Sequence, residues 1–416
     1  MHIHFYHQFF AGKEAPGPMQ PRMLVQMLAE RGHTVDIIAS DFNVYNEQDE
    51  IAELYHTSKG GVVAVHRLRT PRNVRTSLLN RLRTYAVYAW RAYWFGRTLK
   101  RPDVVMTSIQ PLFSGVAAYK MAQYWKAPFL LEIRDLWPDA LVVKKAISRW
   151  QAYPLEKMAR MLYLGASRVV SLTPGIKIEL LKKGVSPAKL DLLPNGFNPE
   201  FSHSAQGMRT KIRSDYGWNE QFVAIYTGTH TEVTAIDVIV KAADALKARK
   251  DIRFDLFGTG QSKAKAMALA KQMELTNIHF HEAVPKSKIP ALLEAADVGI
   301  MTLFKSPLIH IYFENKLIDY MGAKKPIVAA MDGIQAELIT RYGAGKVTAS
   351  FDYKGLAELI EETCDNPDQA KQMGEAGYRF VSTRLVQKTI LEHYVERLES
   401  LACGNIQDVP AWDPLA

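Results

Sequence analysis

Three side chains suited to binding phosphate and hydroxyl groups, Asn315, Lys316 and Asp319, lie close together in the stretch FENKLIDYMGAKKPIVAAMDG, residues 313–333. The apolar spacing predicts that they occupy the opening turns of a helix, followed at once by a buried strand at 326–331. A carboxylate can accept hydrogen bonds from two hydroxyls, whereas a helix start and an ammonium neutralise phosphate charge. The alternative is structural: Asp319 stabilises the dipole of its own helix and Lys316 is a solvated surface lysine.

Polar or glycine-rich loops follow several other predicted strands, at residues 12–17, 227–230 and 258–260. Glycine lets the backbone approach an anion closely, and a following helix N-terminus offers unpaired N–H groups. One such loop is weak evidence, because tight turns need glycine anyway; together they favour a nucleotide or another phosphorylated ligand. The chain has neither G-x-G-x-x-G after the first strand nor G-x-x-x-x-G-K-[ST], so the familiar single-site fingerprints do not apply.

A second candidate centre is the pair Arg134 and Asp135, which follows the apolar run APFLLEI at 127–133. The pair should emerge at the carboxyl end of a strand, where ligands bind in α/β sheets. The carboxylate could orient or deprotonate a substrate hydroxyl, and the guanidinium could pair with a phosphate. The alternative is a buried Arg–Asp pair that only ties the strand to the next helix.

Basic residues recur from Lys59 to Arg101, and no acid occurs between Glu53 and Asp103. Three interpretations are open: stacking of single-stranded nucleic acid, contact with an anionic membrane, or a solvated basic helix whose aromatics lie in the core. We favour the membrane and do not expect nucleic acid as a partner. The residues expected to contact the membrane or a lipid are Arg81, Arg83, Trp90, Arg91 and Trp94.

Both halves of the chain alternate strand-like and helix-like segments that could position these residues. The strands are almost wholly apolar, which predicts parallel sheets with helices on both faces. The fold class is therefore α/β, with two doubly wound Rossmann-like domains, residues 1–195 and 200–384, facing each other across a cleft. Residues 192–202 combine Pro, Asn and Gly without periodicity and predict the linker. A last helix, within about 385–405, is expected to return to the first domain.

Composition excludes several classes of protein. The 416 residues are too many for one core, and 48% hydrophobic with 23% charged residues is ordinary for a globular protein. Two cysteines give no disulfide framework, and we expect neither a signal peptide nor a membrane-spanning run. Residues 1–199 carry 27 Lys and Arg against 15 Asp and Glu, a net charge of +12, whereas the remainder carries −3. This asymmetry indicates an anionic partner for the first half.

Over nearly its whole length the chain resembles the family 4 glycosyltransferases of the GT-B fold, in the branch that builds O-antigen, colanic acid and similar exopolysaccharides. The likeness rests on motifs that occur in order: PDVVMTSIQPLFSGVAA, APFLLEIRDLWPDALV, SRVVSLTPGIKIELLKKGVSPAKLDLLPNGFNPEF, YTGTHTEVTAID, FDLFGTG, VPKSKIPALLEAADVGIMTL and NKLIDYMGAKKPIVAAMDG. It implies a retaining transfer from a nucleotide-sugar, most commonly UDP-linked, that is bound mainly by the second domain. The first domain would bind a polyprenyl-diphosphate-linked saccharide, at the inner face of the cell membrane.

The resemblance also implies roles for individual residues. Asp319 takes the place of the second glutamate of the family's E-x7-E motif and would hold the ribose hydroxyls. The amides around Asn315, Lys316 and Leu317 would contact the pyrophosphate. Val284 would meet the base through its backbone, with Lys286 nearby. The other residues expected to border the donor are Gly17, Gly228, Thr229, His230 and Gly258.

The chain departs from the family pattern at several positions. Ile311 stands where the first glutamate of E-x7-E belongs, and Arg134–Asp135 stand where many relatives have a histidine before an acid. No D-x-D occurs, so we expect no metal at the pyrophosphate and no cofactor. Because of these departures, a nucleotide-sugar 2-epimerase of the same fold and a non-catalytic nucleotide-sugar-binding relative remain as alternatives.

Overall fold

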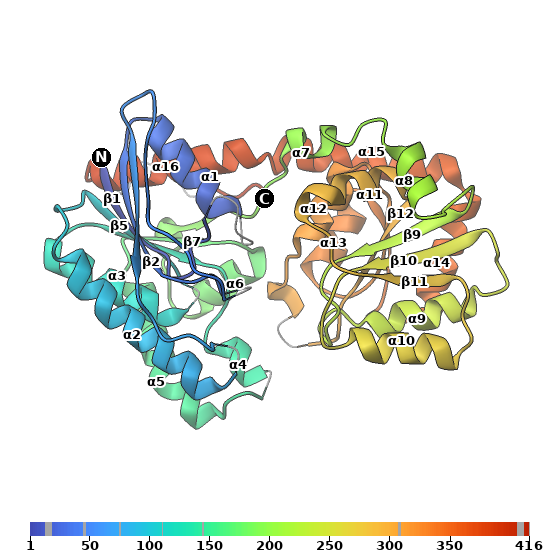
Figure 1. The fold of residues 1–416 in the computed structure, drawn as a ribbon, viewed down its shortest axis with the longest axis horizontal. Helices are drawn as coiled ribbons and strands as arrows, with labels where there is room; N and C mark the ends of the chain where they lie inside the picture. The colour runs from blue at the N-terminus through green and yellow to red at the C-terminus, as the bar shows by residue number, and fades with distance from the viewer. Residues whose placement is uncertain are drawn as a thin grey trace. The chain divides into compact units, whose positions relative to one another are not determined.

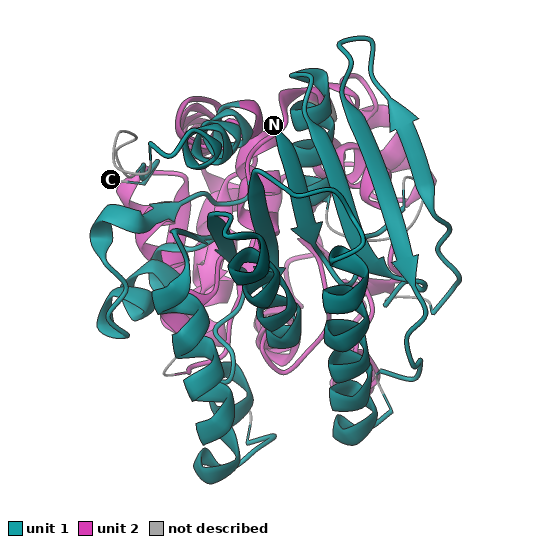
Figure 2. Ribbon diagram, turned by 90° about the vertical axis from the view of Figure 1, so that its left-hand side faces the viewer, with its two compact units in different colours: residues 1–195, 389–416 teal, residues 196–388 magenta. Residues whose placement is uncertain are grey.

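The computed structural model describes the chain except residues 13–18, 45–46, 75, 110, 144, 307–308, 406–411 and 416, and the side chains of 201–202. It divides into two compact units (Figure 1). Unit 1 contains residues 1–195 and 389–416, and unit 2 contains residues 196–388, as the two colours of Figure 2 show. Each unit is an α/β domain built on one sheet.

The sheet of unit 1 has the strand order β3-β4-β2-β1-β5-β6-β7-β8, and its neighbouring strands are parallel except the antiparallel pair β3–β4. Its core strands are buried on both faces, as parallel strands covered by helices must be. The strands are β1 His2–Tyr6, β2 Thr34–Ser40, β3 Glu53–His56, β4 Val62–Leu68, β5 Val104–Ile109, β6 Phe129–Ile133, β7 Arg168–Ser171 and β8 Leu190–Leu192.

Helices cover both faces of this sheet (Figure 1). On one face, α1 and α16 pack against apolar side chains of β1 and β2, such as Ile3, Phe5 and Ile37. The other face is covered by α2, α3 and α5. The helices of this unit are α1 Met19–Glu30, α2 Leu78–Gly96, α3 Leu112–Trp125, α4 Asp139–Val143, α5 Arg149–Gly165, α6 Pro174–Lys182 and α16 Gln387–Ala402, the last beginning in unit 2.

The C-terminal helix α16 is fixed to unit 1 by a buried ionic network as well as by its apolar face. Arg168 on β7 donates from Nε to Asp191 Oδ2 at 2.6 Å, and Arg397 on α16 donates from Nε to Asp191 Oδ1 at 3.3 Å. All three residues are almost fully buried. Because each charge has a partner, the network can be buried at low cost, and loss of Asp191 would remove the carboxylate that the two guanidinium groups share.

Unit 2 holds a parallel sheet with the strand order β11-β10-β9-β12-β13-β14. Helices α9, α10 and α14 contribute to the main apolar core on one side. The strands are β9 Phe222–Thr227, β10 Ile252–Phe257, β11 Ile278–His281, β12 Val298–Thr302, β13 Ile327–Ala330 and β14 Gly345–Thr348. The helices are α7 Pro199–His203, α8 Arg209–Asp215, α9 Ile236–Ala245, α10 Lys263–Gln272, α11 Ile289–Ala295, α12 Asn315–Gly322, α13 Ile334–Arg341, α14 Tyr353–Asp365 and α15 Pro367–Arg384.

The structure corrects two expectations. The basic stretch is not one continuous surface, because Arg67 lies on β4 with its side chain buried and paired to Glu50 at 3.2 Å, and the helix begins only at Leu78. The predicted linker, residues 192–202, is also not wholly irregular, since β8 ends within it at Leu192 and α7 starts at Pro199.

Candidate functional site

In unit 2, two glycines meet where strands β9 and β10 end. Gly228 and Gly258 have φ values of +152° and +155°, which side-chain-bearing residues rarely adopt. A methyl group added at Gly258 would lie 1.8 Å from the Gly228 carbonyl oxygen, and one added at Gly228 would lie 3.1 Å from Lys316 Nζ. Glycine is therefore required here by close packing, and the packing brings the two loops and Lys316 together.

Lys316 is buried, contrary to the alternative of a solvated lysine. Its Nζ donates to the Tyr226 hydroxyl at 2.8 Å, lies 3.3 Å from Glu314 Oε1 and sits 4.1 Å from the centre of the Tyr226 ring. Burial alone would lower the pKa of Lys316, but the Glu314 carboxylate and the Tyr226 hydroxyl raise it above its ordinary value. The structure therefore holds a charged ammonium in place beside the glycine loops.

His230 contacts the same cluster. Its side chain is fully buried, and within the described part of the chain neither ring nitrogen has a hydrogen-bond partner. Its backbone N–H donates to the Thr259 carbonyl at 2.9 Å, which ties the loop after β9 to the loop after β10. Burial, followed by the charges of Lys263 and Lys316, lowers the pKa of His230 to about 4. A neutral imidazole at pH 7 can donate one hydrogen bond to an anion without adding charge.

Helix α12 is held against β9 by its own tyrosine. The Tyr320 hydroxyl accepts the Thr227 backbone N–H at 2.9 Å. Gly299 on β12 makes room for this ring, since a methyl group there would lie 2.4 Å from Tyr320 Cδ2. At the start of α12, the Glu314 backbone N–H donates to Gln335 Oε1 at 2.8 Å. These contacts fix the helix start beside the glycine loops.

Asp319 lies one turn further along α12, and Lys286 holds its carboxylate. Lys286 Nζ donates to Asp319 Oδ1 at 3.0 Å and to Oδ2 at 2.7 Å. Burial raises the pKa of Asp319 above its ordinary value, and the Lys286 ammonium opposes part of that rise. An ionised carboxylate has about four acceptor positions, so this contact leaves room for two hydroxyl groups.

The structure thus brings Gly228, Thr229, His230, Gly258 and Lys316 into one cluster. Asp319 follows one turn along α12, and Lys286, from a separate 3-10 turn, is paired with it. The Thr229 carbonyl accepts a hydrogen bond from the Tyr226 hydroxyl at 2.9 Å, and the residue itself is exposed. The remaining expected donor contacts differ in placement: Asn315 is exposed, Leu317 is fully buried, and Val284 is half-buried. Gly17 lies outside the described residues.

The candidate catalytic pair follows β6 in unit 1, as expected, but its arginine has a partner other than Asp135. Arg134 donates to Glu132 Oε1 at 3.1 Å and to Gln20 Oε1 at 3.3 Å. Glu132 and Gln20 are buried. Residues 132 and 134 share a side because side chains alternate along a strand. The guanidinium is thus positioned by Glu132, and Asp135 lies half-buried at the strand's carboxyl end.

Sequence reasoning missed several residues that shape the site. Tyr226, Glu314 and Gln335 were not singled out, although Glu314 stands five positions before Asp319. One of its oxygens, Oε2, is buried without a hydrogen-bond partner in the described part of the chain. Ile311, at the position of the missing glutamate, is buried in a short 3-10 turn at Ile309–Ile311. A carboxylate is therefore available near the helix start, from a different position.

Helix α2 carries an exposed stripe in unit 1. Leu79, Arg83, Trp90 and Trp94 are spaced four, seven and four residues apart, which puts them on one helix face, and all four are exposed. Tyr85 and Tyr88 on the opposite side are buried, so the aromatics divide between core and surface. No helix within the described residues is long and apolar enough to span a bilayer.

Two family models match consecutive parts of the chain. The family model "Glycosyl transferase 4-like domain" matches residues 19–196, and "Glycosyl transferases group 1" matches residues 208–380. A colanic acid biosynthesis glycosyl transferase, WcaI of Escherichia coli K12, is 23% identical over 392 residues, covering 90% of each chain.

Solved structures share the fold. HepE of Anabaena, in complex with UDP, aligns with a TM-score of 0.70 at 16% identity, covering 96% of this chain and all of that one. WaaG, a glycosyltransferase involved in lipopolysaccharide biosynthesis, aligns with a TM-score of 0.66 at 15% identity. The alignment covers 95% of this chain and 99% of WaaG.

The two Rossmann-like domains and the similarity to these solved glycosyltransferase structures identify the GT-B fold. The protein is a glycosyltransferase of GT-B type. The two family matches together span most of the chain, and the chain belongs to glycosyltransferase family 4.

Proposed function

We propose that the protein is a retaining glycosyltransferase that acts in cell-surface polysaccharide synthesis. It transfers a sugar from a UDP-linked nucleotide-sugar to a lipid-linked acceptor. Unit 2 binds the donor and unit 1 binds the acceptor. The observation that carries the proposal is the buried, charged Lys316 packed beside Gly228, with the Asp319 carboxylate one turn away on the same helix.

This arrangement suits a nucleoside diphosphate. The close packing at Gly228 and Gly258 holds the two loops beside Lys316, and Lys316 with the first amides of α12 supplies positive charge. His230 adds a neutral hydrogen-bond donor. Asp319 takes the ribose hydroxyls while Lys286 continues to hold its carboxylate. Because the Lys316 ammonium and the helix start offset the charge of the diphosphate, we propose that transfer needs no metal ion.

The donor base and the pathway are inferred from relatives. HepE was crystallised with UDP and with UDP-glucose, and the names of WcaI and WaaG place them in colanic acid and lipopolysaccharide biosynthesis. By analogy, the acceptor is a saccharide on a polyprenyl diphosphate. In unit 1, Asp135 orients or deprotonates the acceptor hydroxyl, and Arg134, held by Glu132, faces phosphate or an anionic acceptor.

Incubation with a panel of nucleotide-sugars tests the proposal against its two alternatives. A glycosyltransferase should bind one of them, seen as a raised melting temperature, and release free nucleotide only slowly without acceptor. A 2-epimerase would convert the sugar while keeping the nucleotide attached. A non-catalytic relative would bind and change nothing even when acceptor is added.

We also propose that the protein is cytoplasmic and associates peripherally with the cell membrane. The exposed stripe of α2 (Leu79, Arg83, Trp90 and Trp94) would contact the anionic inner face of that membrane. Trp90 and Trp94 suit the interface, and Arg83 lies on the same face for the headgroups. Arg91, exposed but bound to the Arg69 carbonyl, and Arg81, which donates to the Val74 carbonyl, contribute charge nearby.

We expect the protein to co-sediment with anionic vesicles and to be released by high salt, because each basic residue near the surface contributes about 1 kcal/mol. Replacing Arg81, Arg83 and Arg91 by Glu should weaken this binding and leave nucleotide-sugar binding unchanged. A matched triple exchange on unit 2, Lys247, Lys250 and Lys271 to Glu, serves as the charge control. Equal sedimentation with neutral and anionic vesicles would rule out the electrostatic explanation.

A further inference from the structure

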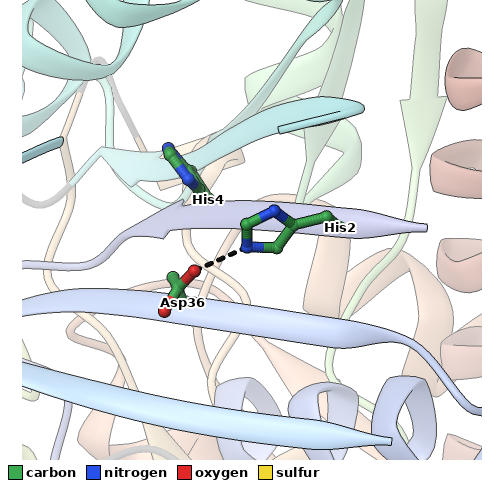
Figure 3. A group of neighbouring side chains, drawn as sticks. All are labelled: His2, His4 and Asp36. Carbon is green, nitrogen blue, oxygen red and sulfur yellow. Dashed lines mark hydrogen bonds and ion pairs between the residues drawn. The ribbon is translucent and has the colours of Figure 1, made fainter. Parts of the chain in front are cut away.

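A histidine–carboxylate cluster lies in unit 1, at the amino ends of strands β1 and β2. His2 and His4 share one face of β1 because side chains alternate along a strand, and Asp36 is paired with His4 across the β1–β2 ladder. Figure 3 shows the three side chains on the two neighbouring strands. One ring nitrogen of each histidine and one oxygen of Asp36 all lie within 4.8 Å of one another.

The contacts of His2 are those of a metal-binding histidine. His2 Nδ1 lies 3.3 Å from the Arg101 carbonyl oxygen, which can only accept, so this nitrogen carries the hydrogen. In a neutral ring, Nε2 then presents its lone pair, and it faces Asp36 Oδ2 at 2.5 Å. Either a proton or a metal ion must then lie between these two atoms. A ligand histidine that donates its other N–H to a carbonyl is the usual outer-shell arrangement at metal sites.

His4 provides a second, independent observation. Its side chain is fully buried, and neither ring nitrogen has a hydrogen-bond partner among the residues that the structure describes. The Lys100 backbone carbonyl lies near the ring. This carbonyl can accept from one ring nitrogen, and a metal ion would satisfy the nitrogen that faces His2 and Asp36.

His66 on β4 holds the other oxygen of the carboxylate. Its Nε2 lies 2.7 Å from Asp36 Oδ1, and its side chain is partly exposed. Asp36 is thereby oriented from one side, with its second oxygen turned toward His2. The opening at His66 also gives solvent a route to the cluster.

We propose that His2, His4 and Asp36 bind a divalent transition-metal ion, Zn²⁺ being the best match, with His66 as an outer-shell partner and a water as fourth ligand. Imidazole and carboxylate are typical zinc ligands. Tetrahedral bonds near 2.0–2.1 Å need ligand atoms about 3.3 Å apart. The 2.5 Å His2–Asp36 contact must therefore open slightly and the longest separation must close, which side-chain rotations can supply.

The site is structural rather than catalytic. It lies at the amino ends of β1 and β2, whereas Arg134 and Asp135 follow the carboxyl end of the parallel strand β6. A bound ion would tie β1 and β2 to each other and, through His66 and Arg101, to β4 and the segment after α2. It would thus stabilise the sheet of unit 1, independently of the proposed transfer.

Zinc titration of the full-length chain after chelator treatment, followed by calorimetry and melting temperature, tests the site. We expect one equivalent of Zn²⁺ to bind and to raise the melting temperature. His66→Gln should weaken binding about 10- to 100-fold, as loss of an outer-shell partner does, and His4→Phe should weaken it more. His33→Gln is the matched control, because His33 also pairs with a carboxylate, Glu399 at 2.8 Å, outside the cluster.

Zinc X-ray absorption on the wild-type protein gives a test that requires no variant to fold. We expect two imidazoles and oxygen ligands in the first shell. Absence of stoichiometric binding, equal affinity in His4→Phe and wild type, or sulfur in the first shell would overturn the proposal. In that case the cluster is only a hydrogen-bonded imidazolium–carboxylate group.

Discussion

Asp135→Asn should lower the turnover of sugar transfer by about a hundredfold or more, which is the usual contribution of a positioned acid–base group. Asparagine keeps the size and the hydrogen-bonding capacity of aspartate, so the change removes the proton-accepting carboxylate and little else. Asp135 lies half-buried after β6, beside an Arg134 that already has Glu132 as its ion-pair partner. Donor affinity and melting temperature should therefore barely change.

Asp139→Asn is the matched control for this experiment. Asp139 lies four residues further along, and its Oδ1 is paired with Lys183 at 2.9 Å, so its role is accounted for by that contact. We expect the control to keep its turnover. If Asp135→Asn melts early yet transfers sugar at the normal rate when folded, Asp135 is a structural residue and the acid–base assignment is wrong.

Asp319→Ala should abolish the stabilisation of the protein by its nucleotide-sugar while the fold remains intact. Losing charge-assisted hydrogen bonds to both ribose hydroxyls should cost on the order of 2–3 kcal/mol, or about 30- to 150-fold in affinity. The fold should tolerate the change, because Lys286, which is paired with Asp319, is half exposed and can be solvated. Calorimetric titration with the donor measures the loss directly.

Lys316→Ala should weaken donor binding about as much as Asp319→Ala does, because it removes the contact between the ammonium and the pyrophosphate. It should also lower the stability of the protein, because Lys316 is buried against Tyr226 and Glu314. Glu375→Ala is the control, since Glu375 pairs with Lys324 at 3.0 Å on the surface of the same unit. Normal donor binding by Asp319→Ala would show that the carboxylate only holds Lys286.

The helix and strand around Asp319 could be predicted because their pattern is local. The apolar spacing of residues 315–322 and the buried run before Gly333 specify α12 and β13 without reference to other segments. Strand β3, Glu53–His56, was missed for the opposite reason. It is an edge strand whose side chains are mostly exposed, so it lacks the alternating apolar pattern that identifies a strand.

The contacts of the site were harder to predict, because they join segments far apart in the sequence. Lysine is exposed by default, and only the placement of Tyr226 ninety residues earlier buries Lys316. The pairing of Lys286 with Asp319 depends in the same way on tertiary structure. The partner of Arg134 could have been found, since Glu132 stands two positions away on the same strand face.

The most direct test of the proposed function is the reaction itself. The wild-type protein is incubated with a UDP-sugar and a polyprenyl-diphosphate-linked saccharide, with chelator present, and both UDP and glycosylated lipid are measured. We predict that the two products form in equal amounts, only when acceptor is present, with the anomeric configuration of the donor retained. An epimerised nucleotide-sugar, or no UDP release with any acceptor of this class, would contradict the proposal.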